Sequence, residues 1–452
     1  GKDWLRSYGS QENQTPNIDR LCNTGMKFRN FYVTPVCSTT RTMLLTGRYP
    51  FRTGWHTHHD SAIYGGGFLD WDREICFARL LRDSGYKTCI SGKWQINDLF
   101  DPNQQDALTK HGFEEHCIWP EAKPGLAGHK KRYWDPYVIR DEKKIDATGR
   151  FGPDVFTEYS IDFMRRHRDK PFLLYQSAIL THIPVTTTPH TPKVKATARE
   201  KFAGMVHYAD HLIGQITQAI TELELRNNTL IFIATDNGTD NGSDQGMVES
   251  LGGMRNGRIS DEGIYSLTER GINMPLIVNC PGWITEARES DALLNAADIL
   301  PTLVDLANAS IPATLKIDGI SFADILRDQS DSSWTRPWTF SQYAEERVIR
   351  DQRYKLYSSG NFFDLAVDPS EQRVISPTTQ TQSQSERRLA LQQVLDAFPK
   401  NNQWPWKFRS ISARKARAAA DAPRRAEWIR NDVPAPNSLK QFFQCPPDYE
   451  LQ

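Results

Sequence analysis

A cysteine and an arginine at helical spacing are the first residues in this chain that could do chemistry. Cys37 follows the turn-forming pair Thr34 and Pro35, and Arg41 comes four positions later in an apolar run that predicts a helix. A helix N-terminus presents unpaired N–H groups and the positive end of a dipole, which favour an anion. Arg41 would add a guanidinium one turn further on. For Cys37 alone, a small buried cysteine before a core helix remains the alternative.

Polar side chains also follow three short apolar segments that predict strands. They are Lys93 and Gln95 after the first, His182 after the second, and Asp236 with Asn237 after the third. Because the carboxyl ends of parallel strands lie along one edge of an α/β sheet, where ligands bind, we expect these groups to gather there.

This set of side chains suits chemistry on a tetrahedral anion. Asp236 and Asn237 supply a carboxylate and an amide oxygen, which are hard donors for Ca²⁺ or Mg²⁺. Arg41, Lys93 and His182 are cationic or hydrogen-bond-donating groups. A sulfur, a divalent cation and an anion clamp together indicate displacement at a sulfuryl or phosphoryl centre. Taken singly, each group also has an ordinary reading as a solvated lysine, a structural histidine or a turn.

The elements that must position these residues alternate between short apolar strands and amphipathic helices. This pattern predicts an α/β fold with a large, mixed but mainly parallel sheet flanked by helices. From about residue 335 short strand-like pieces separated by turns predict a smaller antiparallel sheet, closed by a helix near 384–398. A chain of 452 residues is longer than a single hydrophobic core usually serves. We therefore expect a catalytic domain over 1–334 and a C-terminal subdomain and tail over 335–452, with residues 98–150 as long excursions over the cleft mouth.

Charge and composition exclude several partners. Lys+Arg and Asp+Glu both number 55, so the net charge gives no general attraction to nucleic acid or an anionic membrane. No apolar run approaches the about eighteen residues of a membrane span, and no signal-peptide pattern is present. The seven scattered cysteines indicate neither a disulfide framework nor a zinc site.

The chain resembles the type I sulfatases of the alkaline phosphatase superfamily. The motifs that carry the resemblance are Thr15-Pro-Asn-Ile-Asp-Arg-Leu, Cys37-Ser-Thr-Thr-Arg41, Leu44-Leu-Thr-Gly-Arg-Tyr-Pro50, Gly92-Lys93-Trp, Thr235-Asp236-Asn-Gly238, Thr268-Glu-Arg-Gly271, Asp298-Ile-Leu-Pro-Thr and Tyr354-Lys-Leu. The set in this order is specific, although no single motif is. It implies an alkaline phosphatase-like fold and a sulfuric ester hydrolase.

The resemblance also implies roles for individual residues. In that family a formylglycine-generating enzyme oxidises the motif cysteine to formylglycine, whose hydrate attacks sulfur. Cys37 would be the nucleophile precursor, Arg41 would steady the hydrate, and Lys93 would contact the sulfate and the nucleophile. His182 would bind sulfate or protonate the leaving alcohol, a task that suits imidazole.

Three substitutions depart from the family pattern. The modifying enzyme usually reads Cys-x-Pro/Ala-x-Arg, whereas Thr39 stands at the third place here, which leaves the modification open. Gln95 replaces a usual histidine, so it can contact substrate but cannot carry a proton. Ile264 stands where a lysine usually precedes the Thr-Glu-Arg-Gly motif; Arg255 or Arg258 could substitute, although both could equally be solvated loop residues.

The calcium site is expected to be incomplete. By resemblance Asp236 and Asn237 would hold Ca²⁺, with Mg²⁺ as the alternative. Family members carry a first buried strand ending in two further aspartates, and this chain begins after that place; Asp3 comes too late to replace them. Because Ca²⁺ prefers about six to eight oxygens, it would be poorly held, and a missing strand would leave sheet edges unpaired. We interpret the chain as an N-terminally shortened form of a longer protein.

A sulfated carbohydrate is the expected substrate. His56 and His58 could line a sugar-binding cleft together with the aromatic residues of 118–137, which include Trp119, Tyr133, Trp134 and Tyr137. Surface packing of long loops is an equally good reading of the aromatics, and the histidines could form an adventitious metal-binding surface.

Two other functions stay open. Phosphate or phosphonate ester hydrolysis could use the same scaffold, since the esters differ mainly in charge. A non-catalytic relative that binds sulfated glycans without turnover would explain the changes at Thr39, Gln95 and Ile264. Secretion or a periplasmic location is expected from the family, because polymeric sulfated substrates lie outside the cell.

Overall fold

The computed structural model describes most of the chain up to residue 399. The described residues are 1–11, 13–56, 69–120, 131–191, 196–239, 254–255, 258–259, 263–264, 266–328, 330–332, 334 and 336–399. The chain folds into two compact units. The first consists of Gly1–Tyr49 and Leu180–Pro399, and the second has Pro50–Ile179 as its described part. The division at residue 335 that the sequence suggests stays a prediction.

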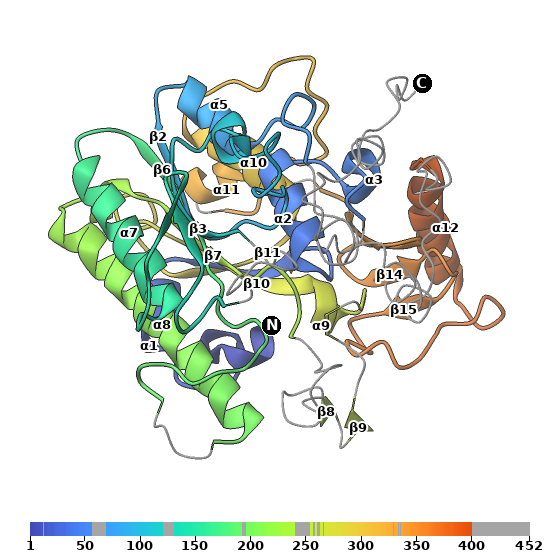
Figure 1. Cartoon of the computed structure of the whole chain (residues 1–452). Helices are drawn as coiled ribbons and strands as arrows, with labels where there is room; N and C mark the ends of the chain where they lie inside the picture. The colour runs from blue at the N-terminus through green and yellow to red at the C-terminus, as the bar shows by residue number, and fades with distance from the viewer. Residues whose placement is uncertain are drawn as a thin grey trace, which may run out of the picture. The chain divides into compact units, whose positions relative to one another are not determined.

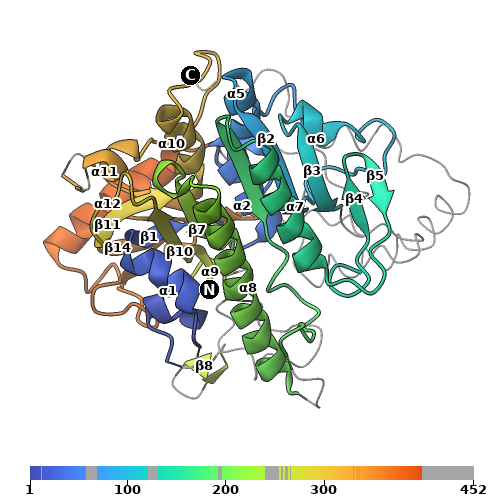
Figure 2. The ribbon, with the colours of Figure 1, turned by 90° about the vertical axis from the view of Figure 1, so that its left-hand side faces the viewer.

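The first unit is built on a mixed sheet in the order β11-β1-β10-β7 (Figures 1 and 2). Its strands are β1 (Met26–Tyr32), β7 (Ile231–Ala234), β10 (Asn273–Asn279) and β11 (Arg288–Asn295). β1 runs parallel to β11 and antiparallel to β10, and β10 runs antiparallel to β7. The two central strands carry fully buried apolar residues such as Phe28 and Leu276, which place the core at the middle of the sheet.

Helices α1 (Pro16–Asn23) and α8 (Ala198–Glu222) pack side by side in this unit, and α1 also contacts β10 (Figure 2). α1 begins with a proline, whose fixed φ suits the first helical position. The buried carboxylate of Asp210 on α8 accepts hydrogen bonds from the backbone N–H groups of Asn17 and Ile18, at 3.1 and 2.8 Å. A side chain of one helix therefore caps the other.

Four more helical segments belong to the first unit. α2 (Cys37–Thr46) contacts the short helix η4 (Ala296–Asp298) and α10 (Ile299–Leu306), and α10 contacts α11 (Ala323–Asp328). The helix expected to begin near residue 37 is thus confirmed, while α11 was not expected.

A small antiparallel sheet completes the first unit. Its strands follow one another in sequence as β12 (Thr339–Tyr343), β13 (Glu346–Arg350), β14 (Tyr354–Tyr357) and β15 (Phe362–Asp364). Helix α12 (Gln382–Ala397) lies against β13 and β14 (Figure 1). Val348 and Tyr357 of this sheet share a buried cluster with Tyr32 and Leu293 of the larger sheet. The predicted C-terminal sheet with its closing helix is confirmed.

The second unit has its own mixed sheet, in the order β5-β4-β3-β2-β6. The strands are β2 (Lys87–Lys93), β3 (Glu115–Trp119), β4 (Val138–Arg140), β5 (Lys143–Ile145) and β6 (Phe172–Ser177). β2 runs parallel to β3 and to β6, whereas β4 and β5 are antiparallel. Helices α5 (Phe77–Asp83) and α7 (Gly152–Arg166) contact β2, and α3 (Pro50–Thr53) and α6 (Ala107–Lys110) are shorter. The mixed α/β class is confirmed.

Four of the strands named above were not predicted from the sequence patterns. Residues 98–150 were expected as excursions, which is wrong for β3, β4, β5 and α6. β3 pairs directly with β2, but it opens with the polar pair Glu115 and His116. β11 was missed because three of its first four residues, Arg288, Glu289 and Asp291, are charged and exposed. The part of the aromatic excursion at 121–130 lies outside the described residues.

The edges of both sheets are partly open. Among the described strands β7 pairs with β10 alone and β6 with β2 alone. The apolar residues Ile231 to Ile233 of β7 and Phe172 to Leu174 of β6 are only half-buried. Every open sheet ends in two such edge strands, so the expectation of a missing strand stays a prediction. Among the described helices none combines the length and the apolar character needed to cross a membrane.

Candidate active site

Cys37 is the first residue of helix α2. Val36 before it has extended backbone angles, and the helix ends at Gly47, whose φ of 67° is the left-handed conformation that glycine adopts easily. The Cys37 residue is only 4% exposed. The predicted helix start is confirmed, and Cys37 therefore lies where backbone N–H groups favour negative charge.

Threonine hydroxyls fix the turn that leads into α2. Thr40 donates from Oγ1 to the carbonyl of Thr34 at 2.9 Å and accepts from the N–H of Thr34 at 3.1 Å. Thr39, which replaces the family's usual Pro or Ala, donates to the carbonyl of Val36 at 2.9 Å and is 1% exposed. The Thr39 hydroxyl is thus hydrogen-bonded to Val36, the residue immediately before Cys37.

The structure brings Arg41 next to Asp236, as the sequence predicted. Arg41 Nε lies 3.5 Å from Asp236 Oδ2. Arg41 is 6% exposed, whereas the Asp236 side chain is 39% exposed, so the carboxylate forms the open side of the pair. Asn237 donates from Nδ2 to the carbonyl of Gly238 at 2.8 Å, which leaves Oδ1 as the amide atom that could hold a cation.

His182 belongs to the same unit, after the segment that follows β6. Its Nδ1 lies 2.7 Å from the carbonyl oxygen of Ile183. Because a carbonyl can only accept, Nδ1 carries the proton, and a neutral ring then has its lone pair on Nε2.

The other predicted site residues belong to the second unit. Lys93 ends β2 and is buried, and its carbonyl accepts a hydrogen bond from Ser177 Oγ at 2.6 Å. Gln95 is buried with a φ of 78°, a left-handed conformation that costs a residue with a side chain about 1–3 kcal/mol and is often found at functional sites. His56 is buried, and His58 lies outside the described residues. The placement of these residues relative to Cys37 stays a prediction.

Two of the four named aromatics are core residues. Trp119 and Tyr133 are buried, with the Arg132 guanidinium 4.2 Å from the centre of the Trp119 ring, while Trp134 is 37% exposed. Packing therefore accounts for Trp119 and Tyr133, and Trp134 remains a candidate sugar contact.

The described residues supply only part of a metal site. Asp236 and Asn237 offer the hard oxygens that Ca²⁺ prefers, but two side chains fall well short of about six to eight ligands. No group of three or more His, Cys, Asp or Glu in the described part of the chain could hold a metal ion. The described side chains alone therefore do not fit a complete calcium site.

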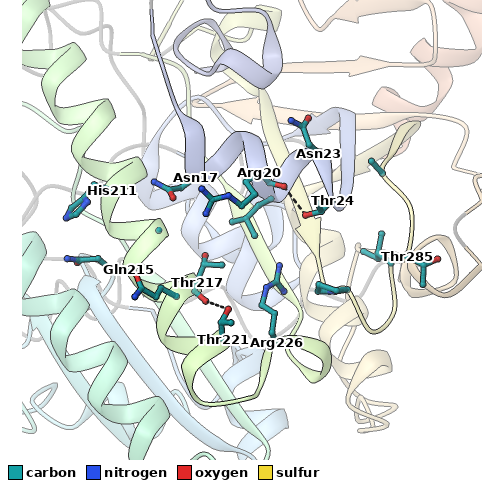
Figure 3. Close-up of a pocket in the computed structure, with 16 residues that line it drawn as sticks. Asn17, Arg20, Asn23, Thr24, His211, Gln215, Thr217, Thr221, Arg226 and Thr285 are labelled. Atoms are coloured by element: carbon teal, nitrogen blue, oxygen red, sulfur yellow. Dashed lines mark hydrogen bonds between the residues drawn. The ribbon is translucent and has the colours of Figure 1, made fainter.

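A separate groove of about 820 Å³ lies on the first unit between α1, α8 and the segment 281–287 (Figure 3). Arg20, Asn17, Thr217, His211 and Arg226 contribute to its lining. It contains none of the predicted site residues.

The sequence patterns missed one group near the site. Glu269 belongs to the Thr268-Glu-Arg-Gly271 motif and Lys355 to the Tyr354-Lys-Leu motif. The motifs alone gave neither residue a role. In the structure Lys355 Nζ lies 3.1 Å from Glu269 Oε1. The residues are 86 positions apart, so only their opposite charges could have suggested the pair.

Comparison with known proteins identifies the family. The sulfatase family model matches residues 1–309, which is more than half of the chain. The chain belongs to the sulfatase family. A second model, described as N-sulphoglucosamine sulphohydrolase, C-terminal, matches residues 265–397 of this sulfatase-family chain.

Curated relatives are themselves sulfatases. Human N-acetylgalactosamine-6-sulfatase is 30% identical over 343 residues, covering 71% of this chain and 63% of the relative. Bovine arylsulfatase A is 27% identical over 395 residues, covering 81% and 75%. The chain thus spans less than two thirds of the length of the human relative.

Solved structures support the fold. Ps i-CgsB in complex with k-i-k-neocarrahexaose superposes with a TM-score of 0.75 at 20% identity, covering 95% of this chain and 97% of that one. A protein solved with its substrate D-glucosamine-2-N,6-O-disulfate gives 0.68 at 21% identity, covering 87% and 94%. The mixed sheets flanked by helices and the small C-terminal sheet are those of sulfatases.

Proposed function

We propose that this sulfatase-family chain is a sulfuric ester hydrolase that removes sulfate from a sulfated carbohydrate. The observation that carries the proposal is the position of Cys37 at the start of a helix whose Arg41 pairs with Asp236. The names of the relatives support sulfate ester chemistry. The structure solved with a disulfated glucosamine supports a sugar as the substrate class.

Formylglycine derived from Cys37 would supply the nucleophilic oxygen. The helix N-terminus and the Arg41 guanidinium would stabilise negative charge as that oxygen approaches sulfur. His182, when protonated at Nε2, would donate a hydrogen bond to the sulfate or deliver that proton to the carbohydrate oxygen as its bond to sulfur breaks. Lys93 and Gln95 would contact the sulfate, and His56 and His58 the sugar.

The modification has a structural requirement. Cys37 and Thr39 are both buried in the folded chain. A formylglycine-generating enzyme would therefore have to reach Cys37 before α2 packs against η4 and α10. That enzyme is a partner in this proposal.

Sulfatases generally depend on a metal ion as well as formylglycine. Asp236 and Asn237 would contribute oxygens to Ca²⁺, or alternatively to Mg²⁺, within a site that needs further ligands. A secreted or periplasmic location would match polymeric sulfated substrates.

Mass spectrometry of the peptide that contains Cys37, after co-expression with a formylglycine-generating enzyme, tests the proposal. We expect the aldehyde, together with hydrolysis of a chromogenic sulfate ester in preference to the matched phosphate ester, and no hydrolysis by C37A. An unmodified thiol with retained binding of a sulfated oligosaccharide would favour a non-catalytic glycan binder. Preference for the phosphate or phosphonate ester would place the chain among phosphohydrolases.

A further inference from the structure

A buried ion network joins the C-terminal sheet to helix α9 (Glu269–Ile272). Lys355 on β14 is 0% exposed, and its Nζ lies 3.1 Å from Glu269 Oε1 and 3.0 Å from Glu371 Oε1. Glu371 Oε1 also accepts the backbone N–H of Glu269 at 2.7 Å, and its other oxygen accepts the hydroxyl of Tyr357. Lys355 is therefore the cation shared by two carboxylates.

The second carboxylate oxygen of Glu269 also has several polar partners. Its Oε2 accepts from the hydroxyl of Tyr32 at 2.6 Å and from Asn273 Nδ2 at 2.9 Å, and Arg350 Nη1 lies 3.5 Å away. Burial alone would raise the pKa of Glu269, but Lys355, Arg350 and these hydrogen bonds lower it to about 2. The carboxylate is therefore ionised at neutral pH, and α9 is anchored by charge at its first residue.

Helix α9 also supports the backbone turn that contains Asp236 and Asn237. The N–H of Gly238 donates to the carbonyl of Gly271 at 3.0 Å. A Cβ atom at Gly238 would lie 2.3 Å from the carbonyl oxygen of Arg270, so the two backbones touch without room for a side chain. A displacement of α9 must therefore displace the turn that presents Asp236 to Arg41.

We propose that Lys355 is a positioning residue of the candidate active site. It acts through Glu269 and Glu371 on α9, and through α9 on the turn of Asp236. Its effect on catalysis rests on the proposed function, whereas its effect on the turn does not. Loss of the Lys355 charge would remove the ion pair of Glu371 and would leave Glu269 with Arg350 and the charge of Lys2. Removing one partner of a buried ion pair is strongly destabilising, because it leaves a buried charge uncompensated.

Hydrogen exchange at the amide of Gly238 tests the proposal without requiring activity. K355M should speed exchange in the peptide that contains Gly238 by about tenfold, because the supporting carbonyl of Gly271 loses its fixed place. K355R, which keeps the charge, should stay close to wild type. R353M is the matched control: Arg353 precedes β14 and pairs with Asp364 at 2.7 Å, so its loss should perturb the sheet and leave exchange at Gly238 unchanged.

A second variant distinguishes the proposed effect from misfolding of K355M. E371Q keeps the side-chain shape and removes one charge, so it should raise Gly238 exchange less than K355M in a folded protein. If Gly238 exchanges no faster in folded K355M or E371Q than in R353M, the proposal is overturned. If exchange responds but the wild-type chain, carrying formylglycine at residue 37, hydrolyses no sulfate ester, the proposed function fails and the positioning role stands.

Discussion

Arg41 Nε lies 3.5 Å from Asp236 Oδ2, and this pair ties the helix that begins at Cys37 to the turn that follows β7. The arginine is buried and the carboxylate is open to solvent. The positive charge of this pair is therefore held inside the protein, whereas its negative charge is accessible to solvent.

The variant D236N should reduce kcat/KM for a sulfate ester by about a hundredfold or more, because it removes the negative charge beside Arg41 while keeping the side-chain shape. Thermal stability should change little, since pairs with an exposed partner contribute about 0–1 kcal/mol. Steady-state kinetics and a melting curve measure the two effects. D291N, which weakens the exposed pair between Asp291 and Arg29, should alter neither.

The variant T39A should raise the fraction of Cys37 that is converted to formylglycine, because it restores the Cys-x-Ala-x-Arg pattern. The loss of the hydrogen bond to the Val36 carbonyl should cost about 1 kcal/mol of stability. Quantitative mass spectrometry after co-expression with the modifying enzyme measures the fraction. An equal or lower yield than wild type would show that Thr39 does not limit the modification.

Calcium should bind weakly to this chain, because Asp236 and Asn237, the ligands found among the described residues, are too few. Titration calorimetry with CaCl₂ should show no tight stoichiometric event. The wild-type chain should likewise turn over slowly. A one-to-one complex with submicromolar affinity would contradict this expectation.

The pKa of Glu269 makes a defined contribution to acid stability. Because this pKa is lowered from 4.5 to about 2 in the folded chain, ionised Glu269 stabilises the fold above pH 4.5, and this stabilisation is lost as the pH falls toward 2. The full effect is about 3 kcal/mol. Urea unfolding of wild type and E269Q should therefore give free energies of unfolding that differ at pH 6, and this difference should shrink below pH 4.5 and vanish only as the pH reaches about 2. A difference independent of pH would exclude ionisation as its source.

Asp210 should matter for stability and not for chemistry. D210A removes a buried carboxylate that accepts two backbone N–H groups at the start of α1, and hydrogen bonds to charged groups are worth about 1.5–3 kcal/mol each. We expect a stability loss of at least about 2 kcal/mol, measured by chemical denaturation. E222A, an exposed position on the same helix, should be neutral.

Local signals predicted most of the fold. The alternating residues of β1 and the long amphipathic pattern of α8 are visible in the sequence itself. β11 was not recognisable, because the charged residues of its exposed half hide the strand pattern. β3 was missed because Glu115 and His116 are polar at its start.

The candidate site was predictable where one motif holds both residues, as with Cys37 and Arg41. Their neighbour Asp236 followed from the rule that ligands gather at strand ends. The pair of Glu269 and Lys355 could not be predicted, because it depends on a packing of β14 against α9 that no local pattern encodes. The left-handed conformation of Gln95 was likewise not predicted from the sequence.

The pairing of β1 also has a consequence for the time available to the modifying enzyme. β1 hydrogen-bonds to β10 and β11, so the first sheet cannot close until residue 295 has been synthesised. At about 5–20 residues per second, the ribosome needs more than about 10 s to pass from Cys37 to that point. Throughout this interval the Cys37 thiol is on a nascent segment that has not yet met its final partners. The long sequence separation between β1 and its partner strands β10 and β11 therefore sets the time in which the modifying enzyme can reach Cys37.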